Sequence, residues 1–90
     1  MSFTHGMNIQ EVQDLGNLLQ RKAEEIDRLI SDVESKVGST TWVGPDAETF
    51  KNQWWPEHKT RLQQVSEGIY GFGQSALNNA SEQEEISRVR

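Results

Sequence analysis

The sequence has no cysteine and only two histidines, so neither a disulfide nor a zinc cluster is expected to stabilise the fold. His5 and His58 are 53 residues apart, far beyond the short spacings of zinc ligands. Ninety residues make one small domain at most. A chain of this length buries only about 60% of its unfolded surface. We therefore expect it to gain stability by associating with another chain.

Long apolar runs and an excess of positive charge are also absent. No hydrophobic run exceeds two residues, so no membrane-spanning segment is predicted. The net charge of −5 argues against a nucleic-acid partner. The first six residues lack the charged start and apolar stretch of a secretory signal. The sequence predicts synthesis in the cytoplasm, with any export independent of a cleaved signal peptide.

The first half of the chain carries two apolar series with a period of seven, which predict one amphipathic helix over about residues 8–37. Asn8 is the expected N-cap, with Glu11 completing a capping box. Gly38 is expected to end the helix in a left-handed conformation. The two series are Ile9, Gly16, Ala23, Ile30, Val37 and Val12, Leu19, Ile26, Val33.

A connector at 38–44 precedes a second predicted helix over about residues 45–78. Pro45 suits the first helical position, after Gly44 as N-cap, whereas Pro56 is expected to kink the helix. The glycines at 68, 71 and 73 indicate either loose turns or close packing against the backbone. Residues 79–90 are polar and are predicted to form a flexible tail. The apolar stripe of the second helix consists of Trp55, Leu62, Ile69 and Ala76, accompanied by Val65 and Phe72.

These elements predict an all-α fold, in which residues 1–80 form an antiparallel helical hairpin that pairs into a four-helix bundle. Gly16 and Ala23 would let a facing helix come close. We expect a homodimer, because both stripes are wider than one neighbouring helix can cover. The predicted dimer interface consists of Val12, Leu19, Ala23, Ile26, Ile30, Val33, Trp55, Leu62, Val65 and Ile69.

Aromatic residues gather around the connector. Trp42 is expected to cover the helix ends, alone or together with a recognition role. Trp55 fits the apolar stripe, whereas its neighbour Trp54 points about 100° away, towards the stripe edge or solvent. His58 is read as a satisfied interface residue, with a pH-sensitive contact as the alternative.

Nothing in the sequence indicates catalysis or a cofactor. No cysteine nucleophile is present, and no serine lies in an evident arrangement with a histidine and an acid. The glycine-rich run follows no strand, so it is not a phosphate loop. We expect a protein that is not an enzyme and has no cofactor or metal.

The motif Trp42-Val43-Gly44, midway between two amphipathic helices in a chain of about ninety residues, resembles the WXG family of ESAT-like type VII secretion substrates. The resemblance covers helix, turn and helix. It implies a secreted, virulence-associated helical hairpin that pairs as a homodimer or with a second WXG-type protein. It also implies export by a membrane ATPase-driven machinery.

One part of the family pattern is altered. Family members often carry a tyrosine followed four residues later by an acid as a secretion signal. Here Tyr70 is followed by Gln74, which makes at best a degenerate signal. Three alternatives follow: the chain travels on a partner's signal, it uses its acidic tail (Glu82, Glu84 and Glu85) instead, or it is not exported.

The predicted function is therefore that of a secreted helical protein acting by dimerisation and protein–protein interaction, as a substrate or a co-secreted partner. The alternative is a cytosolic adaptor or chaperone for a larger secreted toxin or effector.

Overall fold

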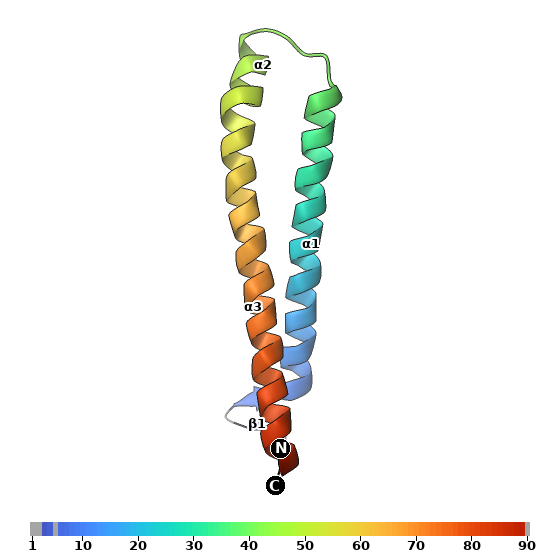
Figure 1. The fold of residues 1–90 in the computed structure, drawn as a ribbon, viewed down its shortest axis with the longest axis vertical. Coiled ribbons are helices and arrows are strands. Elements are labelled where there is room, and N and C mark those ends of the chain that lie inside the picture. Colours follow the sequence, from blue (N-terminus) through green and yellow to red (C-terminus); the bar gives the residue numbers. More distant parts are fainter. Residues whose placement is uncertain (1–2, 5, 90) are drawn as a thin grey trace.

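A computed structural model describes residues 3–4 and 6–89 of the chain; His5 lies outside them. Two long helices, α1 (Ile9–Ser39) and α3 (Trp55–Val89), run antiparallel and side by side (Figure 1). The short helix α2 (Pro45–Thr49) and the π-helical turn η1 (Phe50–Trp54) precede α3 without a break. The body measures 68 × 18 × 17 Å. The predicted helical hairpin is confirmed.

The chain begins with a small antiparallel hairpin of β1 (Phe3–Thr4) and β2 (Met7–Asn8). Gly6 lies in its turn with a φ of 80°, a backbone conformation that favours glycine. Asn8 then caps α1, since its side-chain oxygen accepts a hydrogen bond of 3.0 Å from the backbone N–H of Glu11. The predicted N-cap is confirmed.

The end of α1 differs from the prediction. Gly38 remains helical, and the helix stops at Ser39 with Thr40 as its cap. The hydroxyl of Thr40 donates to the carbonyl of Lys36, which satisfies one of the last open carbonyls without a left-handed glycine. The positive φ of this region lies instead at Gly44, at 123°, where the chain enters α2.

A π-helical turn directly precedes Trp55 and Pro56. The N–H of Trp55 bonds to the carbonyl of Phe50, five residues earlier, instead of four. Proline has no N–H to offer, and its ring needs room beside the preceding turn. The wide turn supplies that room. It also turns the residues before it by about 100° relative to α3, since it adds one residue to the helix.

The seam between α1 and α3 is built from small side chains. Gly16 and Gly73 face each other so closely that a Cβ on either would lie 2.8–2.9 Å from the other's carbonyl oxygen. Gly68 and Gly71, in contrast, have open space around them. Of the two explanations for the glycine-rich run, close packing therefore holds for Gly73 alone. The other buried residues are Ala23, Ile30, Ala47, Trp55, Ser66 and Ala80.

The second long helix extends beyond its predicted end near residue 78. It continues to Val89, and Ala80 is fully buried within this extension. A small side chain every seven residues, at 66, 73 and 80, lets α3 stay close to α1 along this stretch. The segment predicted as a tail is helical in the structure.

Candidate interaction surface

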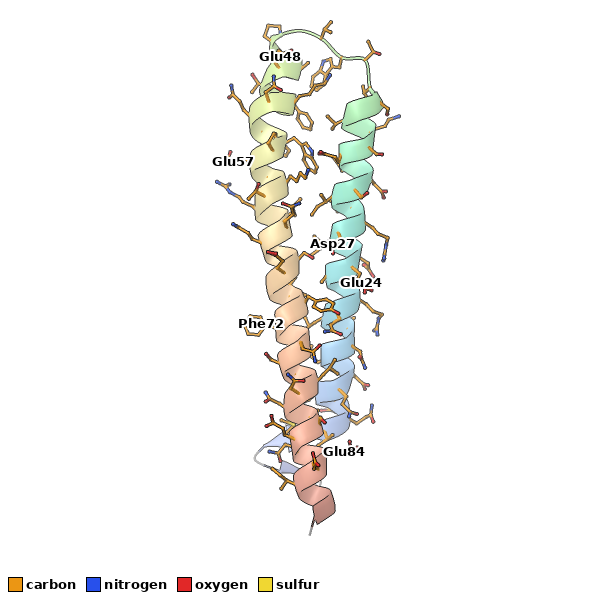
Figure 2. All side chains as sticks on the ribbon, viewed as in Figure 1. Glu24, Asp27, Glu48, Glu57, Phe72 and Glu84 are labelled. Atoms are coloured by element: carbon orange, nitrogen blue, oxygen red, sulfur yellow. The ribbon has the colours of Figure 1, made fainter. Side chains whose placement is uncertain are left out.

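An apolar groove runs between α1 and α3 in the half of the hairpin nearer the termini, with a volume of about 610 Å³. Phe72 forms its outer rim, is 74% exposed and points away from α1 (Figure 2). Contiguous exposed apolar residues mark surfaces that a partner covers in many proteins. The apolar residues that line the groove are Met7, Val12, Leu15, Leu19, Ile69, Phe72 and Ala76.

The same side of the hairpin carries two more exposed apolar residues towards the connector, interspersed with Lys22 and Lys36. Leu29 follows Leu15 by fourteen residues and Val65 precedes Phe72 by seven, so helical periodicity places each on the side of its counterpart. Leu15 and Leu29 are each 49% exposed, and Val65 is 51% exposed. We call this side, formed by the groove together with Leu29 and Val65, the apolar face.

The opposite side is held by polar contacts. The hydroxyl of Ser66 lies 3.0 Å from the carbonyl oxygen of Ala23 and 2.7 Å from a carboxylate oxygen of Asp27. Nearer the termini, the side-chain amide of Gln20 donates to that of Gln74 at 3.2 Å. This side therefore has direct contacts between the two helices, whereas the apolar face is left uncovered.

Glu34 forms the third polar contact between the helices. Its carboxylate accepts a hydrogen bond from the indole N–H of Trp55 and forms an ion pair with the ammonium of Lys59 at 3.0 Å. The bond from Trp55, and then the bond from Lys59, lower the pKa of the Glu34 carboxyl below its usual value. The charged form of Glu34 is the form that joins the helices here.

The residues predicted for the dimer interface divide into three groups. Ala23, Ile30 and Trp55 are buried in the seam of the hairpin itself. Val65 alone among the ten is exposed. The half-buried group lies at the seam edge and comprises Val12, Leu19, Ile26, Val33, Leu62 and Ile69.

The sequence interpretation left three exposed members of the apolar face, Leu15, Leu29 and Phe72, outside the predicted interface. Their spacing of seven or fourteen residues from one another or from Val65 was the available signal. The predicted interface on α3 was centred on Trp55, Leu62 and Ile69, which lie at the seam of the hairpin itself, so the apolar residues beside that stripe were left out.

The Trp42-Val43-Gly44 turn lies at the connector end of the hairpin, as predicted. Trp42 is 42% exposed and packs against Phe50, with ring centroids 5.9 Å apart. The ammonium of Lys51 donates to the carbonyl oxygen of Trp42 at 2.9 Å and ties the turn to η1. Val43 is 85% exposed. The turn therefore exposes part of the Trp42 ring and most of the Val43 side chain.

A stack of rings continues from this turn along α3. Phe50 stacks on Trp54 at 5.4 Å, and Trp54 stacks on His58 at 4.0 Å. The ring nitrogen Nδ1 of His58 lies 2.8 Å from the carbonyl oxygen of Trp54. Trp54 is accordingly half exposed at the stripe edge, while Trp55 is buried, in keeping with their adjacent positions.

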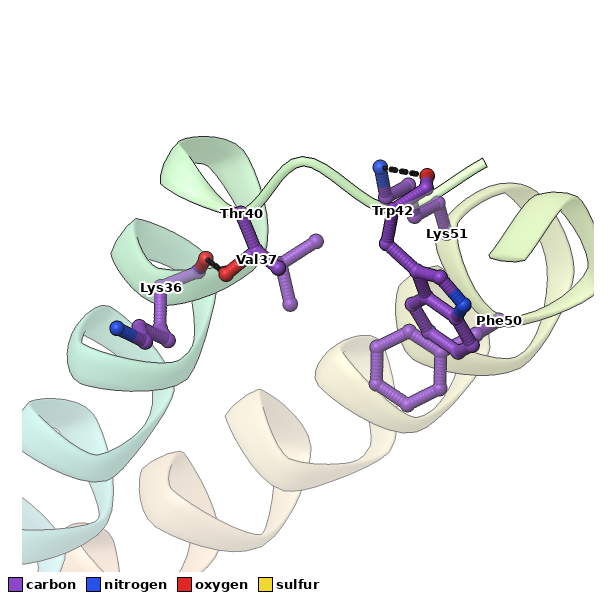
Figure 3. Close-up of a pocket in the computed structure, with 6 residues that line it drawn as sticks. All are labelled: Lys36, Val37, Thr40, Trp42, Phe50 and Lys51. Carbon is purple, nitrogen blue, oxygen red and sulfur yellow. Dashed lines mark hydrogen bonds between the residues drawn. The ribbon is translucent and has the colours of Figure 1, made fainter. Parts of the chain in front are cut away.

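A small hollow of about 180 Å³ opens beside Trp42, between the end of α1 and η1 (Figure 3). Its floor is formed by Val37, Trp42 and Phe50. Lys36 and Lys51 contribute to its lining from the end of α1 and from η1. The ammonium of Lys36 points away from Trp42, and the ammonium of Lys51 is bonded to the carbonyl oxygen of Trp42 (Figure 3). The hollow is therefore an apolar cavity.

The two residues predicted as a degenerate secretion signal, Tyr70 and Gln74, lie one helical turn apart on α3. Tyr70 is exposed, and Gln74 bonds both to Gln20 and, at 3.1 Å, to Asn78. Gln74 thus serves as part of the polar contacts between the helices.

Within residues 3–4 and 6–89, no group of three or more histidine, cysteine, aspartate or glutamate residues could hold a metal ion. No helix in the described part of the chain is long and apolar enough to cross a membrane. No protein-family model, curated protein or solved structure matches the chain.

Proposed function

We propose that this chain is a WXG-type helical hairpin that covers its apolar face with a second copy, forms a four-helix bundle and is exported as a dimer by a type VII secretion machinery. The observation that supports pairing is the contrast between the two sides of the hairpin. One side is held by the contacts of Gln20, Asp27 and Glu34, whereas the other exposes Leu15, Leu29, Val65 and Phe72.

Among the side chains that the structure describes, no large one is fully enclosed. The buried apolar residues of the hairpin are mostly alanine, with Ile30 and Trp55. A second hairpin on the apolar face would remove leucine, valine and phenylalanine side chains from water, at roughly 25 cal/mol for each Å² of apolar area. Burial of the apolar face in a dimer would thus add to the stability that the seam between α1 and α3 gives the single hairpin.

The activity that follows is binding. The Trp42 turn lies at one end of the hairpin, away from the apolar face, and stays available when that face is covered. In the dimer it is the surface presented to the export machinery, whether the chain is itself the substrate or accompanies another protein. A heterodimer with a second WXG-type chain would use the same apolar face.

Export tests this proposal directly. In the organism that encodes the chain, an epitope-tagged copy is expected in the culture fluid when the type VII secretion ATPase is active and only inside the cells when that ATPase is inactivated. A cytoplasmic marker protein controls for lysis. Equal amounts in the culture fluid of both strains would contradict the proposal, as would retention in both.

The turn offers a matched pair of variants for the same assay. Trp42→Ala is expected to reduce export several-fold while leaving the mass of the purified dimer unchanged. Val43→Ala, at the neighbouring position, shortens a side chain that packs little, being 85% exposed, and is expected to be exported normally. If Trp42→Ala is exported normally, the proposal that the export machinery recognises the turn is wrong.

A further inference from the structure

A second pocket, of about 410 Å³, opens beside the Trp42 turn. Its lining comes from the connector, α2 and η1, whereas the apolar hollow described above lies between the end of α1 and η1. Three aromatic rings and one carboxylate contribute to this lining. We call it the aromatic pocket, and its lining residues are Trp42, Asp46, Thr49, Phe50 and Trp54.

The rings of the aromatic pocket form a continuous row. The ring of Trp42 is tilted by 48° against that of Phe50, beside which it lies (Figure 3). Phe50 and Trp54 are nearly parallel, with 19° between their planes. Both tryptophans remain exposed, Trp54 to 48%. The faces of aromatic rings attract cations, and tryptophan does so most strongly. A row of exposed rings therefore favours a cationic ligand.

The two tryptophans are held in place from outside the pocket. At one side, Lys51 donates to the carbonyl oxygen of Trp42. At the other, the ring of His58 stacks on Trp54 with centroids 4.0 Å apart. The pocket is thus ordered before a ligand arrives, which lowers the entropic cost of binding.

The charge at this end of the hairpin also favours a cation. Asp46 is exposed, and among the described residues no side chain bonds to its carboxylate. The other acid of α2, Glu48, already accepts a hydrogen bond of 2.6 Å from Asn52. Residues 42–58 carry three acids and one lysine, a net charge of −2 with histidine neutral. The carboxylate that lines the aromatic pocket is therefore available to a positively charged partner.

We propose that the aromatic pocket binds an arginine side chain of a protein that the chain meets during export. This inference rests on the proposed function, and it specifies the chemistry by which the turn is recognised. A guanidinium is planar, stacks on aromatic rings and can donate two parallel hydrogen bonds to one carboxylate. The rings of Trp42 and Trp54 and the carboxylate of Asp46 supply both kinds of contact. The lysine ammonium is a compact, strongly hydrated charge and suits this lining less well.

A titration with N-acetyl-arginine amide, followed by nuclear magnetic resonance at constant total salt, tests the pocket. The indole N–H signals of Trp42 and Trp54 are expected to shift as the amide is added. The signal of Trp55 is the internal control, because this indole is buried and bonded to Glu34. An absence of shifts at Trp42 and Trp54 would overturn the proposal.

Two further probes test the choice of arginine. N-acetyl-citrulline amide has a similar shape without the charge and is expected to leave all three indole signals in place. N-acetyl-lysine amide is expected to bind several-fold more weakly than the arginine amide. Shifts of equal size with citrulline, or equal affinity for lysine, would overturn the assignment of the pocket to arginine.

Asp46→Asn and Glu48→Gln form a matched pair, since each removes one negative charge from α2. Asp46→Asn is expected to weaken binding of the arginine amide about tenfold, because the charged hydrogen bonds are lost. Glu48→Gln lies outside the lining and is expected to bind as the wild type does. Trp54→Leu is expected to weaken binding about threefold through loss of the ring. Equal affinities of Asp46→Asn and Glu48→Gln would contradict the proposed site.

The export assay separates this inference from the proposed function. Asp46→Asn is expected to reduce export several-fold, and Glu48→Gln to leave it unchanged. If export depends on the ATPase but the arginine amide does not bind, or Asp46→Asn is exported normally, the arginine contact is wrong and the proposed function stands. If the amide binds as expected but export does not depend on the ATPase, the proposed function is wrong and the ligand chemistry of the pocket stands.

Discussion

Gly73 is the residue at which the two long helices come closest. A Cβ there would lie 2.8 Å from the carbonyl oxygen of Gly16 and 2.8 Å from Cγ of Gln20. Since a backbone oxygen cannot swing aside, Gly73→Ala is expected to lower the free energy of unfolding by about 1–3 kcal/mol. Urea unfolding followed by circular dichroism measures this loss.

Gly71 is the matched control for that substitution. It lies two residues away in the same helix, and a Cβ there meets nothing within 4 Å. Gly71→Ala is expected to raise the free energy of unfolding by about 0.5–1 kcal/mol, because alanine restricts the unfolded chain and favours the helix. Equal effects of the two substitutions would contradict the close helix crossing.

Glu34 is expected to make the stability of the hairpin depend on pH. Its pKa is lowered in the folded chain by the hydrogen bond from Trp55 and then by that from Lys59. A carboxyl with a depressed folded pKa contributes stability that is complete above its unfolded pKa and is lost as the pH falls through the folded value. The wild type is therefore expected to lose part of its stability below about pH 5.

Glu34→Gln is expected to show a smaller decline of the unfolding midpoint between about pH 6 and about pH 3, and a lower midpoint at pH 6. Trp55→Phe keeps an aromatic ring but removes the donor, so it is expected to reduce the same decline. Thermal unfolding at a series of pH values provides the comparison. An unchanged decline in both variants would show that this contact does not carry the acid dependence.

At the scale of the elements, the sequence predicted both long helices and the N-caps at Asn8 and Gly44, because seven-residue periodicity and capping residues are local signals. The side of α3 that enters the seam was harder to predict. Large apolar residues such as Val65 and Phe72 suggest a core, yet the seam uses Ser66 and Gly73. Close packing favours small side chains, and hydrophobicity alone does not reveal that preference.

The candidate surface was predictable to a similar degree. The exposed turn at Trp42 follows from a motif that can be read in the sequence. The hollow beside Trp42 could not be predicted from the sequence, because it depends on the rotation of η1 relative to α1. That rotation comes from a π-helical turn, whereas the proline in the sequence predicted only a kink. Val37 and Phe50 are thirteen residues apart in the sequence and line the same hollow only through this geometry.

Pro56→Ala tests the origin of the π-helical turn. With an N–H restored at position 56, the segment is expected to return to α-helical geometry, which turns Phe50 and Trp42 by about 100° away from their present stack. The near-ultraviolet circular dichroism of the stacked rings should fall by about half or more, while the far-ultraviolet helical signal is retained. An unchanged near-ultraviolet spectrum would contradict the role of the proline.

At the scale of the whole molecule, the hairpin is a long rod with two unlike sides. Its sides differ in polarity, because one carries the apolar face and the other carries the polar contacts between the helices. Pairing of two copies through the apolar face covers that face and leaves the polar side in water. This is the physical basis for expecting a defined dimer instead of open-ended association.

The central claim is that the apolar face pairs two copies, and the most direct measurement is the mass of the purified chain by light scattering on a sizing column. The wild type is expected at twice 10.3 kDa, and Phe72→Glu at 10.3 kDa. Tyr70→Glu is the matched control, because Tyr70 is an exposed aromatic on another side of the same helix, 46% exposed, and should remain dimeric. A wild-type chain at 10.3 kDa, or a Phe72→Glu variant that stays dimeric, would contradict the account.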